Sequence, residues 1–574
     1  MQKFSIAFLT FLCGAVHAVG TWKPAPTGLH VYGQQMNMLS DGTVISHTSG
    51  GGSYGNIWDI LKPDSKGSYA TGTWTSNLAP MFDTRIDFSS QILMDGRLYV
   101  AGGEYGTGGS AAEVYDPLTN KWTKTPPPGG FVSDACSAIL PDGKVLQHVV
   151  GGGKKTLIYD PKTNTYSPGP STLGGPNEAA WVKLPDNSIL QVDINSKNSE
   201  RYIPSLNKWV VDATVPVALF DPFGSETGGA VLLPNGKAFF LGSLGPTAVY
   251  TPSGSEAPGV WTATANIPNA QGTPDAPAAM MVNGKVLCAV SPIPTSANHF
   301  PQPVSYYEYD YLTNAFTQVG APSGGLTRNK PTYAGNMLTL PDGTVLYSEQ
   351  GTSSYWVYVP DGTQVNAGKP VIKNITHTGT DCSSGYTVTG TGFNGISEGA
   401  TYGDDEQMNS NYPIIRLTKG ADVYYGRTFN WNSTGVQRGS APDTTQLSLP
   451  VGVPTSSTLS MVVTANGIAS DPFPFTPSCG TAIKDFHLVL LGDFKTSITG
   501  STLNVHFQIS PEILAQGNNA WQLIKVDGKV IQEEKISRSG TWEQKIDLNN
   551  AGKGVFLFIL KNAKNQDIRR IAVQ

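Results

Sequence analysis

A turn dipeptide between short apolar segments recurs seven times in this 574-residue chain. The copies are Asp41-Gly42, Asp95-Gly96, Asp142-Gly143, Asp186-Asn187, Asn235-Gly236, Asn283-Gly284 and Asp342-Gly343. Dipeptides of this kind supply the positive-φ positions of tight hairpins. Their intervals of 54, 47, 44, 49, 48 and 59 residues indicate a repeat architecture, whose units bury their faces only against neighbouring units. The chain is therefore predicted to build seven similar antiparallel sheets.

Aromatic residues follow the turns at a second regular position. The pairs are Tyr115 with Trp122, Tyr159 with Tyr166, Tyr202 with Trp209, Tyr250 with Trp261, and Tyr309 with Phe316. We expect them to pack within and between repeats. With glycine pairs such as Gly102-Gly103, the pattern resembles the kelch repeat, which implies one four-stranded propeller blade per unit. Seven turns then predict a seven-bladed kelch-type β-propeller.

The composition predicts the fold class, and the end of the repeat pattern predicts the domain boundaries. Only 14% of the residues are charged, too few for many long amphipathic helices, and the net charge of −5 gives no basic surface for nucleic acid. The predicted fold class is all-β: residues 19–368 form the propeller, and residues 369–479 and 480–574 form two β-sandwich domains.

The first residues have the pattern of an export signal. Lys3 precedes the apolar run Phe4 to Val16, and cleavage is expected after Ala18. The run is too short to span a bilayer, and no later run reaches spanning length. Residues 1–18 are thus predicted to be a signal peptide of a secreted protein without a transmembrane segment, extracellular or associated with the cell surface.

The cysteines fit an oxidising compartment. Cys382 and Cys479 flank the segment of changed pattern and are the predicted disulfide, whereas Cys136 and Cys288 lie in apolar strands and are expected to be buried thiols.

A carboxylate stands eight residues before four of the seven turns: Asp87, Asp134, Glu178 and Asp275. On a kelch reading these acids gather at the mouth of the propeller axis. Three interpretations are open. The acids hydrogen-bond a neighbouring blade's backbone, they bind a cation or sugar hydroxyls, or they supply an acid and a base for catalysis.

Several segments resemble the galactose oxidase and glyoxal oxidase family of secreted copper-radical enzymes. They are residues 390–397, Tyr402-Gly403-Asp404-Asp405, Asn411-Tyr412-Pro413, and the run from Arg85 to Gly103. The resemblance implies a propeller followed by an early-set, immunoglobulin-like domain over residues 369–479. It also implies one copper ion and a tyrosyl radical cross-linked to cysteine.

The copper-binding positions of that family are mostly substituted. The cysteine falls near Gly33, the cross-linked tyrosine at Asp87, the Tyr-His pair at Tyr333-Ala334, and the last histidine at Phe429. The aromatic residue over the cofactor corresponds to Tyr105. The resemblance thus implies a non-copper relative, with no cofactor and no metal, in which Tyr105, Asp87, Tyr333 and Phe429 line a ligand site.

The last 95 residues are similar to the C-terminal sorting domain of bacterial type IX secretion. The similarity rests on Gln522 to Val530, Gly540-Thr541-Trp542, residues 552–556, and the closing Arg569 to Gln574. The usual Asn-Pro opening is absent, the corresponding residues being Asp493-Phe494-Lys495. A generic sandwich that attaches to a polymer or partner is the alternative.

Three functions follow as hypotheses. The first is an extracellular carbohydrate-binding or surface-interaction protein, whose partner is a glycan or another cell-surface component. The second is a copper-radical oxidase of alcohols or aldehydes that releases hydrogen peroxide. The third is a glycan hydrolase or lyase that uses Asp87, Asp134, Glu178 and Asp275, with Tyr333 as a further catalytic candidate.

Overall fold

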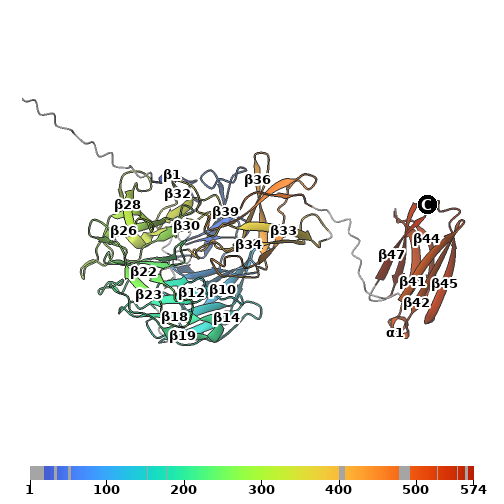
Figure 1. Cartoon of the computed structure of the whole chain (residues 1–574), viewed down its shortest axis with the longest axis horizontal. Coiled ribbons are helices and arrows are strands. Elements are labelled where there is room, and N and C mark those ends of the chain that lie inside the picture. The colour runs from blue at the N-terminus through green and yellow to red at the C-terminus, as the bar shows by residue number, and fades with distance from the viewer. Residues whose placement is uncertain are drawn as a thin grey trace, which may run out of the picture. The chain divides into compact units, whose positions relative to one another are not determined.

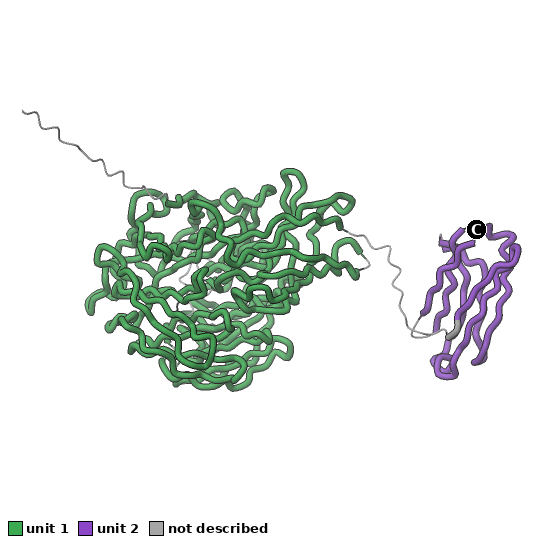
Figure 2. Tube along the Cα trace, in the orientation of Figure 1, with its two compact units in different colours: residues 1–479 green, residues 480–574 purple. Residues whose placement is uncertain are grey.

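The computed structural model describes residues 19–573, except 32–34, 50–53, 151–152, 176, 380, 400–401, 403–407, 478–491, 527, 553 and 563–565. The chain forms two compact units, residues 1–479 and residues 480–574 (Figures 1 and 2). Strands dominate both units, and the only α-helix among the described residues is α1 (Pro511–Leu514). The all-β prediction is confirmed. The proposed signal peptide, residues 1–18, lies outside the described residues.

Seven antiparallel sheets follow one another along the first unit, and each contains one of the seven turns. The first four are β2 (Met36–Met38), β3 (Val44–Thr48), β4 (Ile57–Lys62) and β5 (Thr73–Thr75); β7 (Ser89–Ile92), β8 (Leu98–Ala101), β10 (Ala112–Asp116) and β11 (Lys121–Lys124); β12 (Ser137–Ile139), β13 (Val145–Val149), β14 (Lys155–Asp160) and β15 (Thr165–Pro168); and β16 (Trp181–Lys183), β17 (Ile189–Val192), β18 (Ser199–Ile203) and β19 (Lys208–Val211).

The other three sheets complete the series. They are β20 (Ala230–Leu232), β21 (Ala238–Leu241), β22 (Thr247–Thr251) and β23 (Val260–Ala263); β24 (Gln271–Gly272), β25 (Ala278–Met280), β26 (Val286–Pro292), β27 (Val304–Asp310), β28 (Ala315–Val319) and β29 (Thr327–Arg328); and β30 (Gly335–Thr339), β31 (Val345–Glu349), β32 (Tyr355–Val359) and β1 (Thr21–Pro24). Short segments accompany them: β6 (Arg85–Ile86), β9 (Tyr105–Gly106), η1 (Pro204–Leu206) and η2 (Thr332–Ala334).

The first strands of the sheets contact one another in a ring. Strand β2 contacts β7 and β30, β7 contacts β12, β16 contacts β20, and β25 contacts both β20 and β30. A bridge between Ala135 and Asn177 joins the third sheet to the fourth. The N-terminal strand β1 pairs with β32 of the last sheet, so the two ends of the repeat series are held together by backbone hydrogen bonds.

The turn dipeptides have the predicted conformation. Their second residues all have positive φ, from 67° at Asn187 to 86° at Gly343. In the second sheet Gly96 N–H donates to the Leu93 carbonyl at 2.8 Å, and Leu93 N–H donates to the Arg97 carbonyl at 2.8 Å. The same pair of bonds recurs in the other six hairpins. The local sequence thus fixes where each first strand ends.

The aromatic pairs are directly opposed on the third and fourth strands of their sheets. Tyr115 is the cross-strand partner of Trp122, with ring centroids 5.1 Å apart, and Tyr309 is the partner of Phe316 at 4.8 Å. The other three pairs have the same register. These residues are packing residues, as expected.

Residues 371–475 form an eight-stranded sheet within the first unit. It contains β33 (Val371–His377), β34 (Tyr386–Thr391), β35 (Ile414–Lys419), β36 (Asp422–Phe429), β37 (Asp443–Ser448), β38 (Leu459–Ala465), β39 (Ile468–Ala469) and β40 (Phe473–Phe475). Its connection from β34 to β35 reaches the ring of first strands: Leu232 N–H donates to Ser397 Oγ at 3.3 Å, and Asn409 Nδ2 donates to Gln91 Oε1 at 3.4 Å.

The second unit has two sheets over one apolar core. One sheet is β41 (Gly492–Thr499), β42 (Thr502–Ile509) and β45 (Gly540–Asp547), and the other is β44 (Val530–Lys535), β43 (Ala520–Lys525), β46 (Gly554–Lys561) and β47 (Gln566–Val573). The sequence predicts strands at 503–507 and 555–560, and both segments lie within β42 and β46. It also predicts a strand at 486–491, which lies outside the described residues.

Cys136 and Cys288 are buried thiols, as predicted. Cys479 lies outside the described residues, so its disulfide with Cys382 stays a prediction. No helix among the described residues is long and apolar enough to cross a membrane.

Candidate functional site

Four acids occupy one equivalent position in four sheets and share an unusual backbone conformation. The φ angles of Asp87, Asp134, Glu178 and Asp275 are 50°, 51°, 52° and 47°. Each residue stands two or three positions before the first strand of its sheet. A non-glycine residue in the left-handed region costs roughly 1–3 kcal/mol and recurs where the side chain has a task. Glutamate gains nothing from this conformation, so Glu178 in particular indicates a requirement for a carboxyl group.

Backbone hydrogen bonds between neighbouring sheets hold these positions. Glu178 N–H donates to the Asp134 carbonyl at 3.0 Å, and Asp275 N–H donates to the Thr227 carbonyl at 3.0 Å. Thr227 is the equivalent residue of the fifth sheet. Glu104 N–H donates to the Asp87 carbonyl at 3.0 Å. Main-chain atoms make these bonds, so they do not use the carboxyl groups.

The side chains are close enough to perturb one another. Burial raises the pKa of Asp87 well above its usual range, and Asp275, Glu104 and Asp134 raise it further by charge repulsion. Burial, followed by repulsion from Glu104, raises the pKa of Asp134 to about 6. Like charges that share a partly desolvated site favour the protonated form. The structure therefore brings together three of the four predicted acids, and the fourth, Glu178, lies beside Asp134 through the backbone bond.

Glu226 is a member of this group that the sequence pattern did not reveal. Burial raises its pKa to about 9, and Asp275, Asp221 and Asp134 contribute repulsion. The Tyr402 hydroxyl, which comes from the β34–β35 connection, donates to Glu226 Oε2. In the fifth sheet Thr227 stands at the position where four other sheets have an acid, and Glu226 comes one residue earlier. A carboxylate next to the repeated position was therefore the only sign of Glu226 in the sequence. We define the acidic mouth as the set Asp87, Glu104, Asp134, Glu178, Glu226 and Asp275.

A pocket of about 480 Å³ opens between the second and third sheets at the acidic mouth. Glu104 lies on its wall from the loop after β8, and Asp134 lies on its wall from the segment before β12. The other lining residues are small, hydroxylated or apolar: Gly103, Gly106, Thr107, Gly109, Ser110, Phe131, Ser133 and Val150. The volume suits one or two sugar rings or a molecule of similar size.

The exposed aromatic side chains gather at the same end of the sheets. The largest exposures among the described aromatics belong to Tyr54, Phe82, Tyr105, Phe131, Phe223 and Tyr333. Tyr54 and Tyr105 lie between the second and third strands, and the other four precede first strands. Both kinds of connection lie at one end of an up-and-down antiparallel sheet, opposite the turn dipeptides. This end therefore presents aromatic faces around carboxyl groups.

Gln350 connects two of the predicted site residues. Its Nε2 donates to Asp87 Oδ1 at 3.3 Å and to the Tyr333 carbonyl at 3.4 Å. The Tyr333 ring is 39% exposed and Tyr105 is 55% exposed, so both are accessible to a ligand. The hydrogen bond from the Tyr105 hydroxyl to Glu104, together with repulsion from that carboxylate, raises the pKa of Tyr105 to about 12.

Phe429 lies at the turn end of the second sheet rather than beside these residues. It ends β36, where Arg427 stacks on its ring at 4.8 Å and donates through Nη2 to the Asp95 carbonyl at 2.8 Å. Asp95 and Asp87 lie at opposite ends of β7. The part of residues 371–475 that reaches the acidic mouth is the β34–β35 connection, which carries Tyr402.

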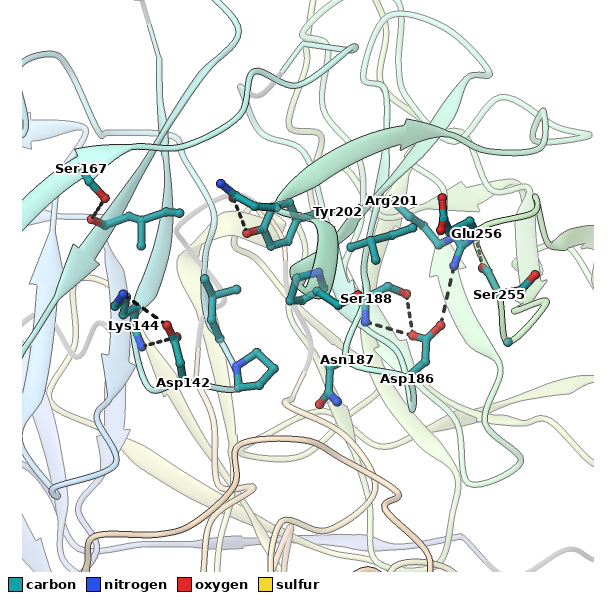
Figure 3. Close-up of a pocket in the computed structure, with 18 of the residues that line it drawn as sticks. Asp142, Lys144, Ser167, Asp186, Asn187, Ser188, Arg201, Tyr202, Ser255 and Glu256 are labelled. Carbon is teal, nitrogen blue, oxygen red and sulfur yellow. Dashed lines mark hydrogen bonds and ion pairs between the residues drawn. The ribbon is translucent and has the colours of Figure 1, made fainter.

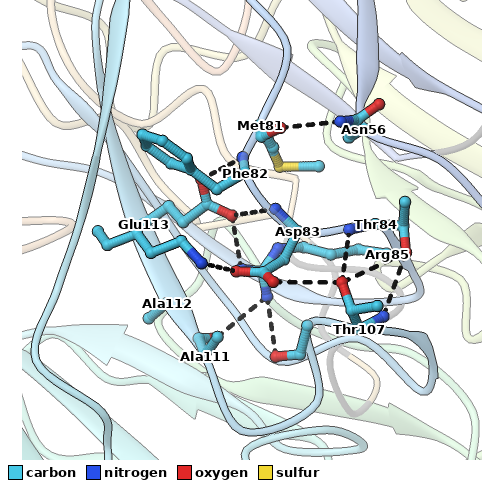
Figure 4. A network of polar contacts seen from close by, with 12 residues as sticks. Asn56, Met81, Phe82, Asp83, Thr84, Arg85, Thr107, Ala111, Ala112 and Glu113 are labelled. Atoms are coloured by element: carbon cyan, nitrogen blue, oxygen red, sulfur yellow. Dashed lines mark hydrogen bonds and ion pairs between the residues drawn. The ribbon is translucent and has the colours of Figure 1, made fainter.

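A buried arginine holds the loop that forms one wall of the pocket (Figure 4). Arg85 is fully buried, and its Nη1 donates to the Gly108 and Ala111 carbonyls at 3.1 and 3.0 Å and also to the Gly102 carbonyl. Its Nη2 pairs with Glu113 Oε1 at 2.9 Å. Glu113 also accepts from the backbone of Phe82 and Asp83. Arg85 thereby positions the loop of Glu104 and Tyr105.

A larger pocket of about 730 Å³ lies at the turn ends of the third and fourth sheets (Figure 3). Its two cations are paired: Lys144 with Asp142 at 3.4 Å, and Arg201 with Asp212 at 2.5 Å and with Asp186 at 3.7 Å. Glu256, an exposed carboxylate, also lines it. We regard this pocket as a gap between sheets, because both of its cations are already paired with acids.

Two positions that correspond to copper ligands in the family resemblance, Ala334 and Phe429, have side chains without a donor atom. Ala334 is a buried methyl group, Phe429 lies at the other end of the sheets, and Asp87 favours its protonated form. Gly33 lies outside the described residues. No three His, Cys, Asp or Glu side chains of the described part of the chain are grouped so that they could hold a metal ion.

The buried histidines are packing residues. Burial lowers the pKa of His47 to about 4 and that of His148 to about 3, and both rings lie against tryptophan side chains.

Two family models match parts of the chain. Residues 93–129 match the Kelch motif, and residues 499–574 match the secretion system C-terminal sorting domain. The kelch pattern and the sorting module expected from the sequence are thus confirmed in these regions. The sorting domain shows that the protein is exported, to the cell surface or the extracellular space, as predicted.

Solved structures resemble the chain at low identity, and no curated protein matches it. A novel fungal alcohol oxidase of the AA5 family, in complex with copper, is 16% identical with a TM-score of 0.48, over 80% of this chain and 100% of that one. A streptogramin B lyase is 10% identical with a TM-score of 0.41, over 60% and 98%. A catalytically inactive virginiamycin B lyase from Staphylococcus aureus, with quinupristin, is 11% identical with a TM-score of 0.39, over 60% and 100%.

Proposed function

We propose that this exported protein binds an extracellular carbohydrate at the acidic mouth, without copper-radical chemistry. One observation carries the proposal: every strongly exposed aromatic ring of the described residues lies at the end of the sheets where the carboxyl groups gather around a pocket. Sugars present apolar ring faces and hydroxyl groups together. Aromatic rings and carboxyl groups match these two features, because the rings cover the apolar face and the carboxyl groups accept or donate hydrogen bonds.

Glycan binding should depend on the pocket walls. We expect Tyr105→Ala and Asp134→Asn each to weaken binding about tenfold, since each removes an interaction worth about 1.4 kcal/mol or more. The measurement is isothermal titration calorimetry with neutral hexasaccharides of glucose, galactose, mannose and N-acetylglucosamine.

Two variants at the turn ends are the matched controls. Leu118→Ala removes an exposed apolar side chain, and Asp142→Asn removes an exposed carboxylate, and neither should change affinity. If no hexasaccharide binds, with or without amino groups, or if the control variants weaken binding as much as the pocket variants, carbohydrate binding at the mouth is rejected.

Copper reconstitution tests the alternative hypothesis, that the protein is a copper-radical oxidase. We expect the purified protein, incubated with Cu(II) and dialysed, to retain far less than one copper per chain. We also expect no hydrogen peroxide when galactose, glyoxal or methylglyoxal is added. Stoichiometric copper together with peroxide release would establish an oxidase and overturn the proposal.

A further inference from the structure

We infer that the acidic mouth selects glycans that carry free amino groups, through an ammonium subsite formed by Glu226 and Asp221. The inference rests on the proposed function and names the ligand class for the same site. Its basis is the imbalance of charge at the mouth, an unpaired buried oxygen beside Glu226, and the aromatic rings that surround the carboxyl groups.

The charge imbalance is local. None of the ten residues that line the 480 Å³ pocket is Lys or Arg. After burial, the main causes of the raised pKa values of Asp87, Asp134 and Glu226 are other acids. Lys330, which donates to the Gln350 carbonyl at 3.2 Å, lies 3.9 Å from Glu349. Arg85, the buried cation of the adjoining loop, is paired with Glu113. A uronate or a sulfated sugar would add a further negative charge, and an ammonium group would relieve the repulsion.

The subsite is marked by an oxygen that lacks a hydrogen-bond donor. Asp221 is 0% exposed, and its Oδ1 accepts from the backbone of Phe223 and Gly224 at 2.6 and 2.7 Å. Its Oδ2 is buried without a partner. A Cβ placed on Gly224 would lie 3.3 Å from this oxygen and 3.4 Å from Glu226 Oε1, so both oxygens face the same small space. A buried polar atom of this kind is costly unless a ligand satisfies it.

The surrounding aromatic rings suit the same ligand. A cation over the face of an aromatic ring gains about 0.5–2 kcal/mol, depending on desolvation. Phe223 follows Asp221 by two residues and is 43% exposed. The carboxyl oxygens thus supply charge and the exposed ring supplies a face, a combination that recognises ammonium groups.

Binding of an ammonium group should release protons. The carboxyl groups of the mouth are partly protonated near neutral pH because burial and repulsion raise their pKa values, to about 6 for Asp134 and about 9 for Glu226. An added positive charge lowers both pKa values, so protons leave as the ligand binds. A neutral sugar has no such effect.

The experiment compares a glucosamine hexamer with an N-acetylglucosamine hexamer and a polyuronate hexamer on the full chain. We expect the glucosamine hexamer to bind at least about tenfold more tightly than the acetylated one at pH 6, and the polyuronate to bind weakest. Titration in two buffers of different ionisation enthalpy should show proton release only for the glucosamine hexamer. Added salt should weaken that complex selectively.

Variants separate the subsite from general charge attraction. Glu226→Gln and Asp221→Asn should each reduce the preference for the glucosamine hexamer over the acetylated hexamer to less than about threefold. Asp142→Asn is the control and should preserve the preference. Equal affinities of the two hexamers would overturn the inference but leave carbohydrate binding intact, whereas failure of all sugars to bind would reject both. A preference that survives both subsite variants would overturn the assignment to Glu226 and Asp221.

Discussion

Replacing Arg85 by Met should lower the free energy of unfolding of the first unit by about 3–5 kcal/mol, because it breaks a buried ion pair and strands the partner charge. Glu113 is 0% exposed and would keep its bonds to the backbone of Phe82 and Asp83 but lose its cation. The carbonyl groups of Gly102, Gly108 and Ala111 would also lose the guanidinium donor, although Gly108 and Ala111 would keep a backbone donor. Urea denaturation followed by tryptophan fluorescence measures the change.

The matched control is Arg97→Met. Arg97 pairs with Asp95 at 2.7 Å, but its side chain is 31% exposed, so water can replace the lost interaction and the loss should stay below about 1 kcal/mol. The double variant Arg85→Met with Glu113→Gln should lose less than the sum of the two single variants, since the second change removes the stranded charge. Additive losses would contradict the account of Arg85 and Glu113 as one coupled pair.

The repeat architecture was accessible from sequence because its determinants are local. A hairpin turn such as Asp95-Gly96 requires positive φ at its second residue, and this requirement shows in the residue type itself. The turns also allow residues of different sheets to be compared by their distance from the turn. Each of four acids, Asp87, Asp134, Glu178 and Asp275, lies eight residues before a turn, so the sequence alone shows that they are equivalent.

The rest of the site consists of residues that are close in three dimensions but far apart in the sequence, so sequence spacing could not predict it. Glu226 was passed over because Thr227 occupies the repeated position, and its neighbours Asp275 and Tyr402 lie 49 and 176 residues further along the chain. Phe429 entered the predicted site through the family resemblance, as the position of the last histidine. The chain instead reaches the mouth through the β34–β35 connection, and no local pattern marks that path.

The raised pKa of Glu226 predicts that its contribution to the stability of the fold decreases as the pH rises. An acid in an ordinary salt bridge has the opposite pH dependence. The carboxyl group titrates near its usual value of 4.5 in the unfolded chain and at about 9 in the folded protein. Between these values the folded state binds a proton that the unfolded state releases. The contribution to folding is therefore greatest below pH 4.5 and is lost as the pH rises towards about 9.

Glu226→Gln should remove this pH-dependent loss of folding stability, because the amide is neutral at every pH and can still accept the hydrogen bond from Tyr402. We expect the variant to be more stable than the wild type by roughly 4–5 kcal/mol at pH 8, because each pH unit above 4.5 costs the wild type about 1.4 kcal/mol, and to differ by less than about 0.5 kcal/mol at pH 4. Glu256→Gln changes an exposed carboxylate in the same unit and should have no effect at either pH. Denaturation curves at pH 4, 6 and 8 decide the matter. A variant that is destabilised at pH 8 would show that Glu226 is ionised and paired in the folded protein, and an equal effect at pH 4 and pH 8 would show that its titration is not the cause.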